Sequence, residues 1–249
     1  MEKQYDLKDE MGRKEEWRLI ESNCLDAYTN MAIDEGIFIG REKLGLPATL
    51  RFYGWEPAAI SIGYFQKIED PSLKEYKRQK LTIVRRFTGG GAILHENEIT
   101  YSLACPTNEF VAFSNIEKTQ QLVHQAIILA LQSLRINAQL KRKQSKKPDP
   151  YFCFVNPCKD DVVEDGQKIV GSAQRRRNRT FFQHGSIKIS PQIKEEKKNI
   201  GKIIDSLVLG FEKRFGIRLL PGQLTREEVK LSRELRDVKY STQNWNYRR

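Results

Sequence analysis

The segment of this 249-residue chain that decides its fold reads Val84-Arg85-Arg86-Phe87-Thr88-Gly89-Gly90-Gly91-Ala92-Ile93-Leu94-His95. The apolar run at 81–84 predicts a buried strand that ends in two arginines. Three consecutive glycines lack a Cβ, so the backbone there can approach a ligand closely. The next apolar segment, ending at 100–103, is interpreted as the returning strand. These features predict cations and main-chain N–H groups at one lip of a sheet, which suits an anionic or strongly polar ligand head.

The three glycines taken alone are equally compatible with a glycine-rich hairpin flanked by solvated arginines. They do not form a Walker loop, because no Gly-Lys-Ser/Thr follows at the required spacing. The rest of the chain must therefore decide between a turn and a binding loop.

Strands and helices are predicted on both sides of this segment. Strands are expected at 17–20, at 48–53 and 58–64 as a pair joined by the turn 54–57, and at 162–163 with 169–170 as a hairpin, then at 180–189. Helices are expected at 26–40, 70–80, 115–135 and 200–215, and after a capping box formed by Thr225 and Glu228. His124 is placed on the solvent-facing flank of its helix.

The chain is expected to form one domain over 16–249, preceded by a frayed, polar lead-in over 1–15. Residues 141–150 carry five cations and two prolines and are predicted to form a flexible basic loop. Asp34 and Glu35 could be catalytic carboxylates, but without a second acidic cluster a solvated or structural role is favoured.

Composition limits the class of function. No run reaches the ~18 apolar residues of a membrane span, and the N-terminus has no apolar signal core, so a cytoplasmic protein without membrane contact is expected. The four cysteines form no CxxC pair and the three histidines are far apart, so no metal site is expected. The net charge of +11 fits either nucleic acid or an acidic protein partner, and no nucleic-acid motif accompanies it.

Cys153 is the candidate nucleophile, and Lys168 lies fifteen positions after it. A free thiol has a pKa of about 8.5, and a neighbouring ammonium group stabilises the reactive thiolate. The lysine could also shuttle a proton. The pattern alone leaves this open, since a cysteine between phenylalanines is more often a core residue.

The glycine-rich segment resembles the signature of the lipoate and octanoate branch of the biotin and lipoate protein ligase superfamily. Further motifs agree with this resemblance in chain order from residue 16 to residue 249: Asn30-Met31-Ala32-Ile33-Asp34-Glu35, Arg51-Phe52-Tyr53-Gly54-Trp55, Ser61-Ile62-Gly63-Tyr64-Phe65-Gln66, Gly171-Ser172-Ala173-Gln174, Gln183-His184-Gly185-Ser186-Ile187 and Trp245-Asn246-Tyr247-Arg248-Arg249. The order of these motifs is more specific than any one of them.

The resemblance implies an α+β fold, a mixed sheet flanked by helices as in the catalytic domain of that superfamily. It implies an octanoyltransferase in protein lipoylation, needing no cofactor, in which Cys153 carries the acyl thioester and Lys168 assists. The donor would be octanoyl-acyl carrier protein, and the acceptor a lysine of a glycine-cleavage H protein or of a dehydrogenase E2 lipoyl domain. The implied substrate-binding residues are Arg86, Thr88, Gly89, Gly90, Gly91, Ala92, His95, Gly171, Ser172, Ala173 and His184.

Two alternatives stay open. Gly91 completes a triple glycine like that of ATP-dependent lipoate ligases, and in such a ligase Lys168 would hold a carboxylate or phosphate while Cys153 stayed idle. A basic adaptor or RNA-binding module without catalysis could also use this fold. His95 and His184 are interpreted as packing and hydrogen-bonding residues rather than general bases, and no role is assigned to Cys158.

Overall fold

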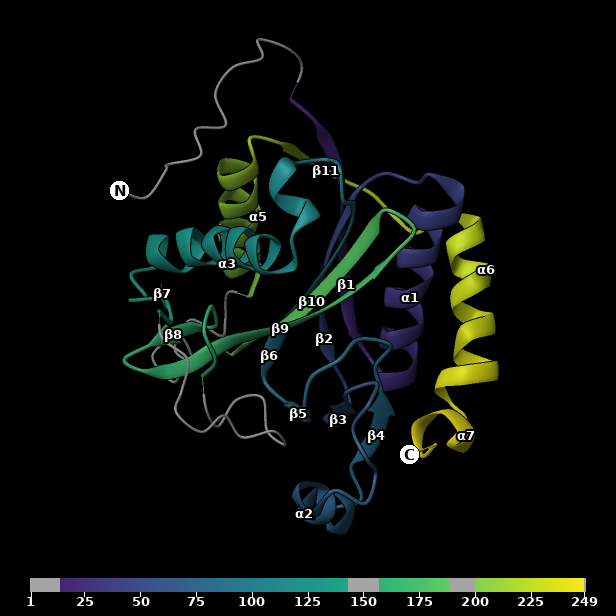
Figure 1. The fold of residues 1–249 in the computed structure, drawn as a ribbon. Coiled ribbons are helices and arrows are strands. Elements are labelled where there is room, and N and C mark those ends of the chain that lie inside the picture. Colours follow the sequence, from purple (N-terminus) through teal and green to yellow (C-terminus); the bar gives the residue numbers. More distant parts are fainter. Residues whose placement is uncertain (1–13, 143–156, 189–199, 249) are drawn as a thin grey trace.

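The computed structural model describes residues 14–142, 157–188 and 200–248 (Figure 1). Three parts of the sequence-based predictions lie outside the described residues. They are most of the lead-in (1–13), the greater part of the basic loop (143–150) and Cys153.

The centre of the fold is a mixed eight-stranded sheet. Its strands lie in the order β11 (Arg218–Pro221), β1 (Glu16–Leu25), β2 (Thr49–Trp55), β6 (Glu98–Pro106), β10 (Thr180–Lys188), β9 (Gln167–Arg177), β8 (Val162–Glu164) and β7 (Gln139–Leu140). β1 is parallel to both of its neighbours, and the remaining pairs are antiparallel. The strand predicted at 180–189 and the hairpin at 162–170 are confirmed as β10 and as β8 with β9.

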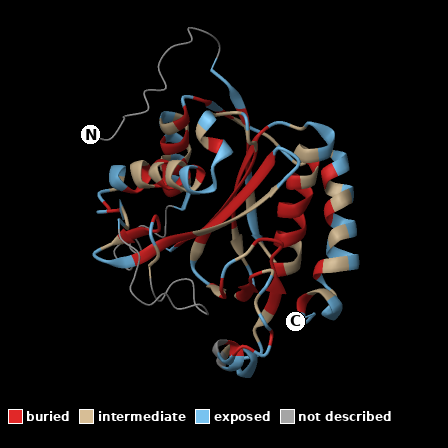
Figure 2. Cartoon of the chain, viewed as in Figure 1, coloured by how far each residue is buried: buried red, intermediate tan, exposed pale blue. Residues whose placement is uncertain are grey.

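Helices cover the two faces of this sheet, as Figure 1 shows. One face carries α3 (Ile116–Ser133) and α5 (Ile200–Phe215), and the other carries α1 (Ala27–Leu44), with α6 (Arg226–Leu235) outside it. In Figure 2 the central strands and the inner side of α1 are buried, while α6 exposes its outer side. The predicted mixed sheet flanked by helices is therefore confirmed.

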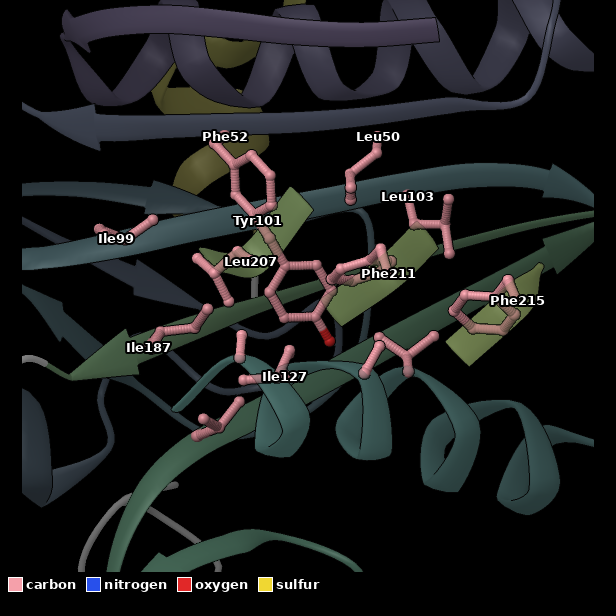
Figure 3. Close-up of a cluster of buried hydrophobic side chains, with 14 of the residues drawn as sticks. Leu50, Phe52, Ile99, Tyr101, Leu103, Ile127, Ile187, Leu207, Phe211 and Phe215 are labelled. Atoms are coloured by element: carbon pink, nitrogen blue, oxygen red, sulfur yellow. The ribbon is translucent and has the colours of Figure 1, made fainter. Parts of the chain in front are cut away.

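The larger core lies between the sheet, α3 and α5. Figure 3 shows Tyr101 of β6 surrounded by apolar side chains, among them Phe52 and Phe211. The Tyr101 ring lies 6.3 Å from that of Phe211 (ring centroids), and both residues are fully buried. The Tyr101 hydroxyl is a polar group within this cluster, and it lies 2.6 Å from the Ser172 hydroxyl of β9.

A second, three-stranded sheet holds the glycine-rich segment. β3 (Ala59–Ile62) lies between the parallel β4 (Thr82–Arg85) and the antiparallel β5 (Ile93–His95). The three glycines therefore connect β4 to β5, and in Figure 1 this small sheet lies at the lower ends of β2 and β6.

Two predicted strand pairings are wrong. Residues 48–53 and 58–64 do not form a hairpin, because β2 pairs with β1 and β6 while β3 belongs to the small sheet. Residues 100–103 likewise do not return beside 81–84, since β6 lies in the large sheet. All of β3 and most of β2 are buried. Neither strand therefore shows the alternation of buried and exposed residues that would indicate its place in a sheet.

Helix ends follow their sequence signals. Asp26 caps α1 by accepting the N–H groups of Tyr28 and Thr29, both at 3.0 Å, and the capping box of Thr225 and Glu228 is confirmed at the start of α6. The predicted helix at 70–80 is a 3-10 turn (Pro71–Leu73) followed by the short α2 (Lys74–Arg78).

The C-terminal segment returns to the small sheet. After a π-helical turn (η4, Arg236–Tyr240) and α7 (Gln243–Asn246), the Asn246 side chain accepts the main-chain N–H of Arg85 at 2.9 Å. Lys239 pairs with Glu35 of α1 at 2.6 Å, so Glu35 has a structural role. In the part of the chain that the structure describes, no helix is long and apolar enough to cross a membrane.

Candidate active site

A pocket lies between α1, the large sheet and the glycine loop. Ligand pockets are mostly apolar with a few polar groups, and the wall of this one fits that description. Its wall is formed by Met31, Tyr53, Trp55, Arg86, Gly90, Ile93, His95, Thr100, Lys168, Gly171, Ser172, Ala173, His184, Gly185 and Ser186.

The pocket brings together most of the residues predicted from the sequence. Arg86, Gly90, His95, Lys168, Gly171, Ser172, Ala173 and His184 all line it. Thr88, Gly89, Gly91 and Ala92 belong to the same loop but do not form the wall. Cys153 lies outside the described residues, so its distance from Lys168 is not part of this geometry.

Arg86 holds the glycine loop in place. Its side chain is buried, and Nη1 donates to the carbonyl and hydroxyl oxygens of Ser61 at 2.8 and 2.7 Å. Nη2 donates to the carbonyls of Gly89 and Gly91 at 2.8 and 3.0 Å. The guanidinium group therefore links the glycine loop to β3 by hydrogen bonds.

Arg85 is directed away from the pocket and is fully buried. Its guanidinium donates to the carbonyls of Gly63 (2.9 Å), Gln66 (2.6 Å) and Asn246 (3.0 Å). The two arginines that the sequence placed at the lip as ligand-binding cations therefore have extensive main-chain contacts within the protein.

The loop lies directly against the turn that follows β3. Gly90 has φ +93°, a conformation that side-chain-bearing residues rarely adopt. A Cβ built on Gly63 would lie 1.8 Å from the carbonyl oxygen of Gly90, so only glycine allows this approach. The Gly63–Gly90 contact sets the position of the pocket wall.

Asp34 organises a buried polar cluster behind the pocket. Its carboxylate accepts Arg51 Nη1 at 2.8 Å, the Tyr53 hydroxyl at 2.7 Å and the Ser102 hydroxyl at 2.9 Å. Burial alone would raise the pKa of Asp34, but the hydrogen bond from His184 and the charge of Arg51 outweigh it and lower that pKa. Asp34 is thus a structural carboxylate rather than a solvated one.

His184 is fixed between Asp34 and Thr88. Nδ1 lies 3.2 Å from Asp34 Oδ2, and Nε2 lies 2.7 Å from the Thr88 hydroxyl. Burial lowers the pKa of His184, which favours the neutral ring. Since a carboxylate only accepts, Nδ1 carries the proton and Nε2 accepts from Thr88. Both nitrogens are used, as expected for a packing residue.

His95 is fixed in the same way. Its Nδ1 lies 2.5 Å from Glu98 Oε1 and its Nε2 lies 2.6 Å from the Ser61 hydroxyl, while Trp55 stacks on the ring at 3.8 Å. Both ring nitrogens again have partners inside the protein. Glu98 was missed from the sequence, because an acidic residue between two strands resembles an ordinary turn.

Lys168 provides an ammonium group at the pocket wall. Its side chain is 5% exposed, and Nζ lies 2.7 Å from Asp161 Oδ2. The same carboxylate oxygen accepts the main-chain N–H of Cys158 at 2.7 Å. The sequence singled out Lys168 but not Asp161, which lies in a turn with no periodic pattern around it.

The prediction that His124 lies on the surface is wrong. The ring is fully buried, because the turn before β8 and strand β9 cover that flank of α3. Nδ1 lies 2.5 Å from the Asp160 carbonyl and so donates to it, which leaves Nε2 to accept from the Ser172 hydroxyl at 2.7 Å. The Ser172 oxygen in turn lies 2.6 Å from the Tyr101 hydroxyl.

This histidine makes stability depend on pH. Burial lowers the pKa of His124 from 6.5 to about 4. Between these two pH values the unfolded chain binds a proton that the folded protein does not bind. The contribution of neutral His124 to the free energy of unfolding is therefore fully present above pH 6.5 and is lost as the pH falls toward 4. We expect His124 to account for a loss of about 3 kcal/mol in the free energy of unfolding over that range. Urea titrations of the wild type and His124→Gln at several pH values measure it; equal pH dependence of the two would contradict it.

The arginine cluster at 175–177 is partly engaged within the protein. Arg176 donates to the Phe113 carbonyl at 2.6 Å and to the Thr119 hydroxyl at 2.7 Å, and Arg177 forms an ion pair with Glu42. These contacts leave less free charge for nucleic acid than the sequence suggests. Among the described residues, no group of three or more His, Cys, Asp or Glu side chains could hold a metal ion.

Comparison with known proteins identifies the family to which this fold and pocket belong. A model of the lipoyl protein ligase A/B catalytic domain matches residues 26–209, and the chain belongs to this family. The octanoyltransferase LipM of Geobacillus kaustophilus is 31% identical, over 95% of this chain and 99% of that protein. The octanoyltransferase LipM of Bacillus subtilis is 30% identical, over 95% of this chain and 100% of that protein.

Solved structures agree on the fold. Lipoate-protein ligase A bound with ATP superimposes with a TM-score of 0.76 at 25% identity, covering 93% of this chain and 98% of that one. A bi-partite lipoate protein ligase from Thermoplasma acidophilum, described together with its E2 lipoyl domain, has a TM-score of 0.74 at 24% identity and covers 94% and 96%.

Proposed function

We propose that this chain transfers an octanoyl group to a lysine of a lipoyl-accepting protein. The observation that carries the proposal is the apolar pocket with the Lys168 ammonium group at its wall, in a chain collinear with octanoyltransferases over their whole length. We also propose that residues 16–249 act as one catalytic domain, which is supported by the pairing of β1 with β11.

In the proposed reaction the acyl chain lies in the pocket and Cys153 is the nucleophile. The Cys153 thiol gives up its proton, the thiolate attacks the thioester carbonyl of octanoyl-acyl carrier protein, and the carrier thiolate leaves and takes up that proton. The acceptor lysine amine then attacks the octanoyl-cysteine, an amide forms, and the Cys153 thiol is regenerated. The Lys168 ammonium group stabilises the thiolate and the negative charge that develops on the carbonyl oxygen.

The proposed partners are an acyl carrier protein as donor and, as acceptor, an H protein of glycine cleavage or an E2 lipoyl domain. The acceptor class is supported by the archaeal relative described with its E2 lipoyl domain. The reaction exchanges one thioester for another before the amide forms, so it needs no nucleotide.

An ATP-dependent ligase is the second candidate, since its structure shares this fold. A nucleotide needs cationic or N–H groups for its phosphates. Here the Arg85 and Arg86 side chains bond mainly to main-chain oxygens of the protein. Lys168 is a cation at the pocket wall that suits either reaction, so the preference for transfer from a thioester rests on the octanoyltransferases that this chain matches over almost their whole length.

A transfer assay tests the proposal. Purified protein, octanoyl-acyl carrier protein and an acceptor lipoyl domain are combined without ATP, and the acceptor mass is followed. We expect the acceptor to gain one octanoyl group, at a rate that added ATP does not change. Octanoylation that occurs only from free octanoate and ATP would show that the chain is a ligase instead.

The position of the glycine loop should matter for this transfer. In Gly63→Ala the new methyl group meets the Gly90 backbone, so the loop must move away from the pocket. A displacement of about 1 Å near a reacting group costs roughly a hundredfold in rate, and we expect a loss of that size in kcat/KM.

Gly201→Ala is the matched control for this variant, because a Cβ there meets nothing within 4 Å. We expect it to transfer octanoate as the wild type does. Full activity in Gly63→Ala would show that the Gly63–Gly90 contact does not set the pocket.

A further inference from the structure

Asp161 lies next to the pocket and has no role in the reaction described so far. Its carboxylate and the Lys168 ammonium group are 2.7 Å apart, and both side chains are 5% exposed. A charge buried to this extent is costly unless it is paired. Lys168 therefore depends on an acidic partner if it is to stay charged at the pocket wall.

We propose that Asp161 is a positioning residue for the transfer reaction, which holds Lys168 at the pocket wall and keeps it in the ammonium form. This inference rests on the proposed function, in which Lys168 acts as a cation. Asp161 does not touch the substrate; it acts through Lys168.

Asp161 is held rigidly enough for such a role. Its main-chain carbonyl accepts the N–H of Lys141 at 2.8 Å, and the N–H of Asp160 donates to the Lys141 carbonyl at 2.9 Å. His124 of α3 donates to the Asp160 carbonyl at 2.5 Å. The turn is thus attached to the end of β7 and to α3, so the carboxylate is in place before a substrate binds.

The same carboxylate joins Lys168 to the chain near Cys153. The Cys158 N–H bonds to Asp161 Oδ2 at 2.7 Å, and Cys158 follows the proposed nucleophile by five residues. One oxygen atom therefore contacts both the lysine and the segment that leads back toward the nucleophile.

Within the described ranges, Asp161 is the acidic side chain that forms an ion pair with Lys168. Lys188 of β10 and His124 of α3 lie within electrostatic reach of the ammonium group. Lys188 is a cation, and burial keeps His124 neutral at ordinary pH by lowering its pKa to about 4. The neighbouring Asp160 carboxylate instead accepts the Gln121 side chain at 3.1 Å.

Burial of Lys168 determines the direction in which removal of Asp161 shifts its deprotonation. Without the Asp161 charge, desolvation favours the neutral amine, so Lys168 loses its proton at lower pH. A neutral amine does not stabilise the thiolate, so the alkaline limb of the pH–rate profile moves to lower pH as well.

The direct test measures the protonation of Lys168 without using catalysis. The protein is labelled briefly with acetic anhydride at a series of pH values, because only the neutral amine reacts, and acetylation of Lys168 is quantified by peptide mass spectrometry. We expect the labelling midpoint in Asp161→Asn to lie at least about one pH unit below that of the wild type, as for loss of a close counter-charge. An unchanged midpoint overturns the inference.

Two variants serve as controls. Asp160→Asn removes a charge from the adjacent residue without touching Lys168, and we expect it to keep the wild-type midpoint. Asp161→Glu keeps the charge, and we expect it to restore the midpoint at least in part. A shift in Asp160→Asn equal to that in Asp161→Asn would show a general charge effect and would also overturn the inference.

A double-mutant comparison covers the case in which Asp161→Asn does not fold. In Lys168→Gln the Asp161 carboxylate still accepts the Cys158 N–H, and Lys168→Gln/Asp161→Asn removes both charges of the pair. We expect both variants to fold and their transfer rates to agree within about twofold. A further tenfold loss in the double variant would show that Asp161 does not act through Lys168. If Asp161→Asn shifts the labelling midpoint as expected but the wild type transfers no octanoate, the proposed function fails and the role of Asp161 in holding the Lys168 charge stands.

Discussion

Cys153→Ala is expected to lose octanoyl transfer by about a thousandfold or more, because the covalent route needs a nucleophile at that position. Steady-state transfer from octanoyl-acyl carrier protein to a lipoyl domain measures the loss. The residual rate reports what the pocket and Lys168 achieve by binding alone.

Cys158→Ala is the matched control for this effect. Cys158 is partly exposed, and it contacts Asp161 through its main-chain N–H, which alanine retains. We expect this variant to transfer at nearly the wild-type rate. If Cys158→Ala lost activity and Cys153→Ala kept it, the nucleophile would be Cys158.

Asp34→Ala is expected to cause the largest loss of stability. The Arg51 and Asp34 side chains are fully buried, so removal of the carboxylate leaves a guanidinium group without its counter-charge. It also removes the acceptor of Tyr53 and Ser102. Breaking a buried ion pair in this way costs about 3–5 kcal/mol, and urea denaturation monitored by circular dichroism measures it.

Glu117→Ala is the control for an exposed ion pair. Glu117 pairs with Lys159 at the surface, where solvent screens the interaction, and we expect no measurable change in unfolding midpoint. If Asp34→Ala lost less than about 1 kcal/mol, the polar cluster behind the pocket would not be a stabilising element.

Local signals predicted much of this fold. The capping box of Thr225 and Glu228 gave the start of α6, because capping depends on residues three positions apart. The triple glycine predicted a close approach of the backbone, and in the structure Gly90 lines the pocket with a positive φ. The family resemblance, rather than a local signal, singled out Gly171, Ser172 and Ala173, and all three line the pocket from β9.

Strand partners and buried polar contacts were not predictable in the same way. The segments 48–53 and 58–64 are close in sequence, but their strands are buried and find partners in different sheets. His124 has polar neighbours on its helix, and only the turn before β8 makes it a buried residue. Asp161, just before β8, forms an ion pair with Lys168 of β9. An ion pair between two separate segments leaves no periodic pattern in the sequence.

In the proposed reaction an octanoyl group passes through a thioester on Cys153. Intact-mass analysis after mixing the wild type with octanoyl-acyl carrier protein, without ATP or acceptor, detects this intermediate. We expect a gain of one octanoyl group that hydroxylamine removes, that peptide mapping locates at Cys153, and that Cys153→Ala lacks. An unmodified wild-type protein that still octanoylates the acceptor, or an acyl group located on Cys158, would contradict the account.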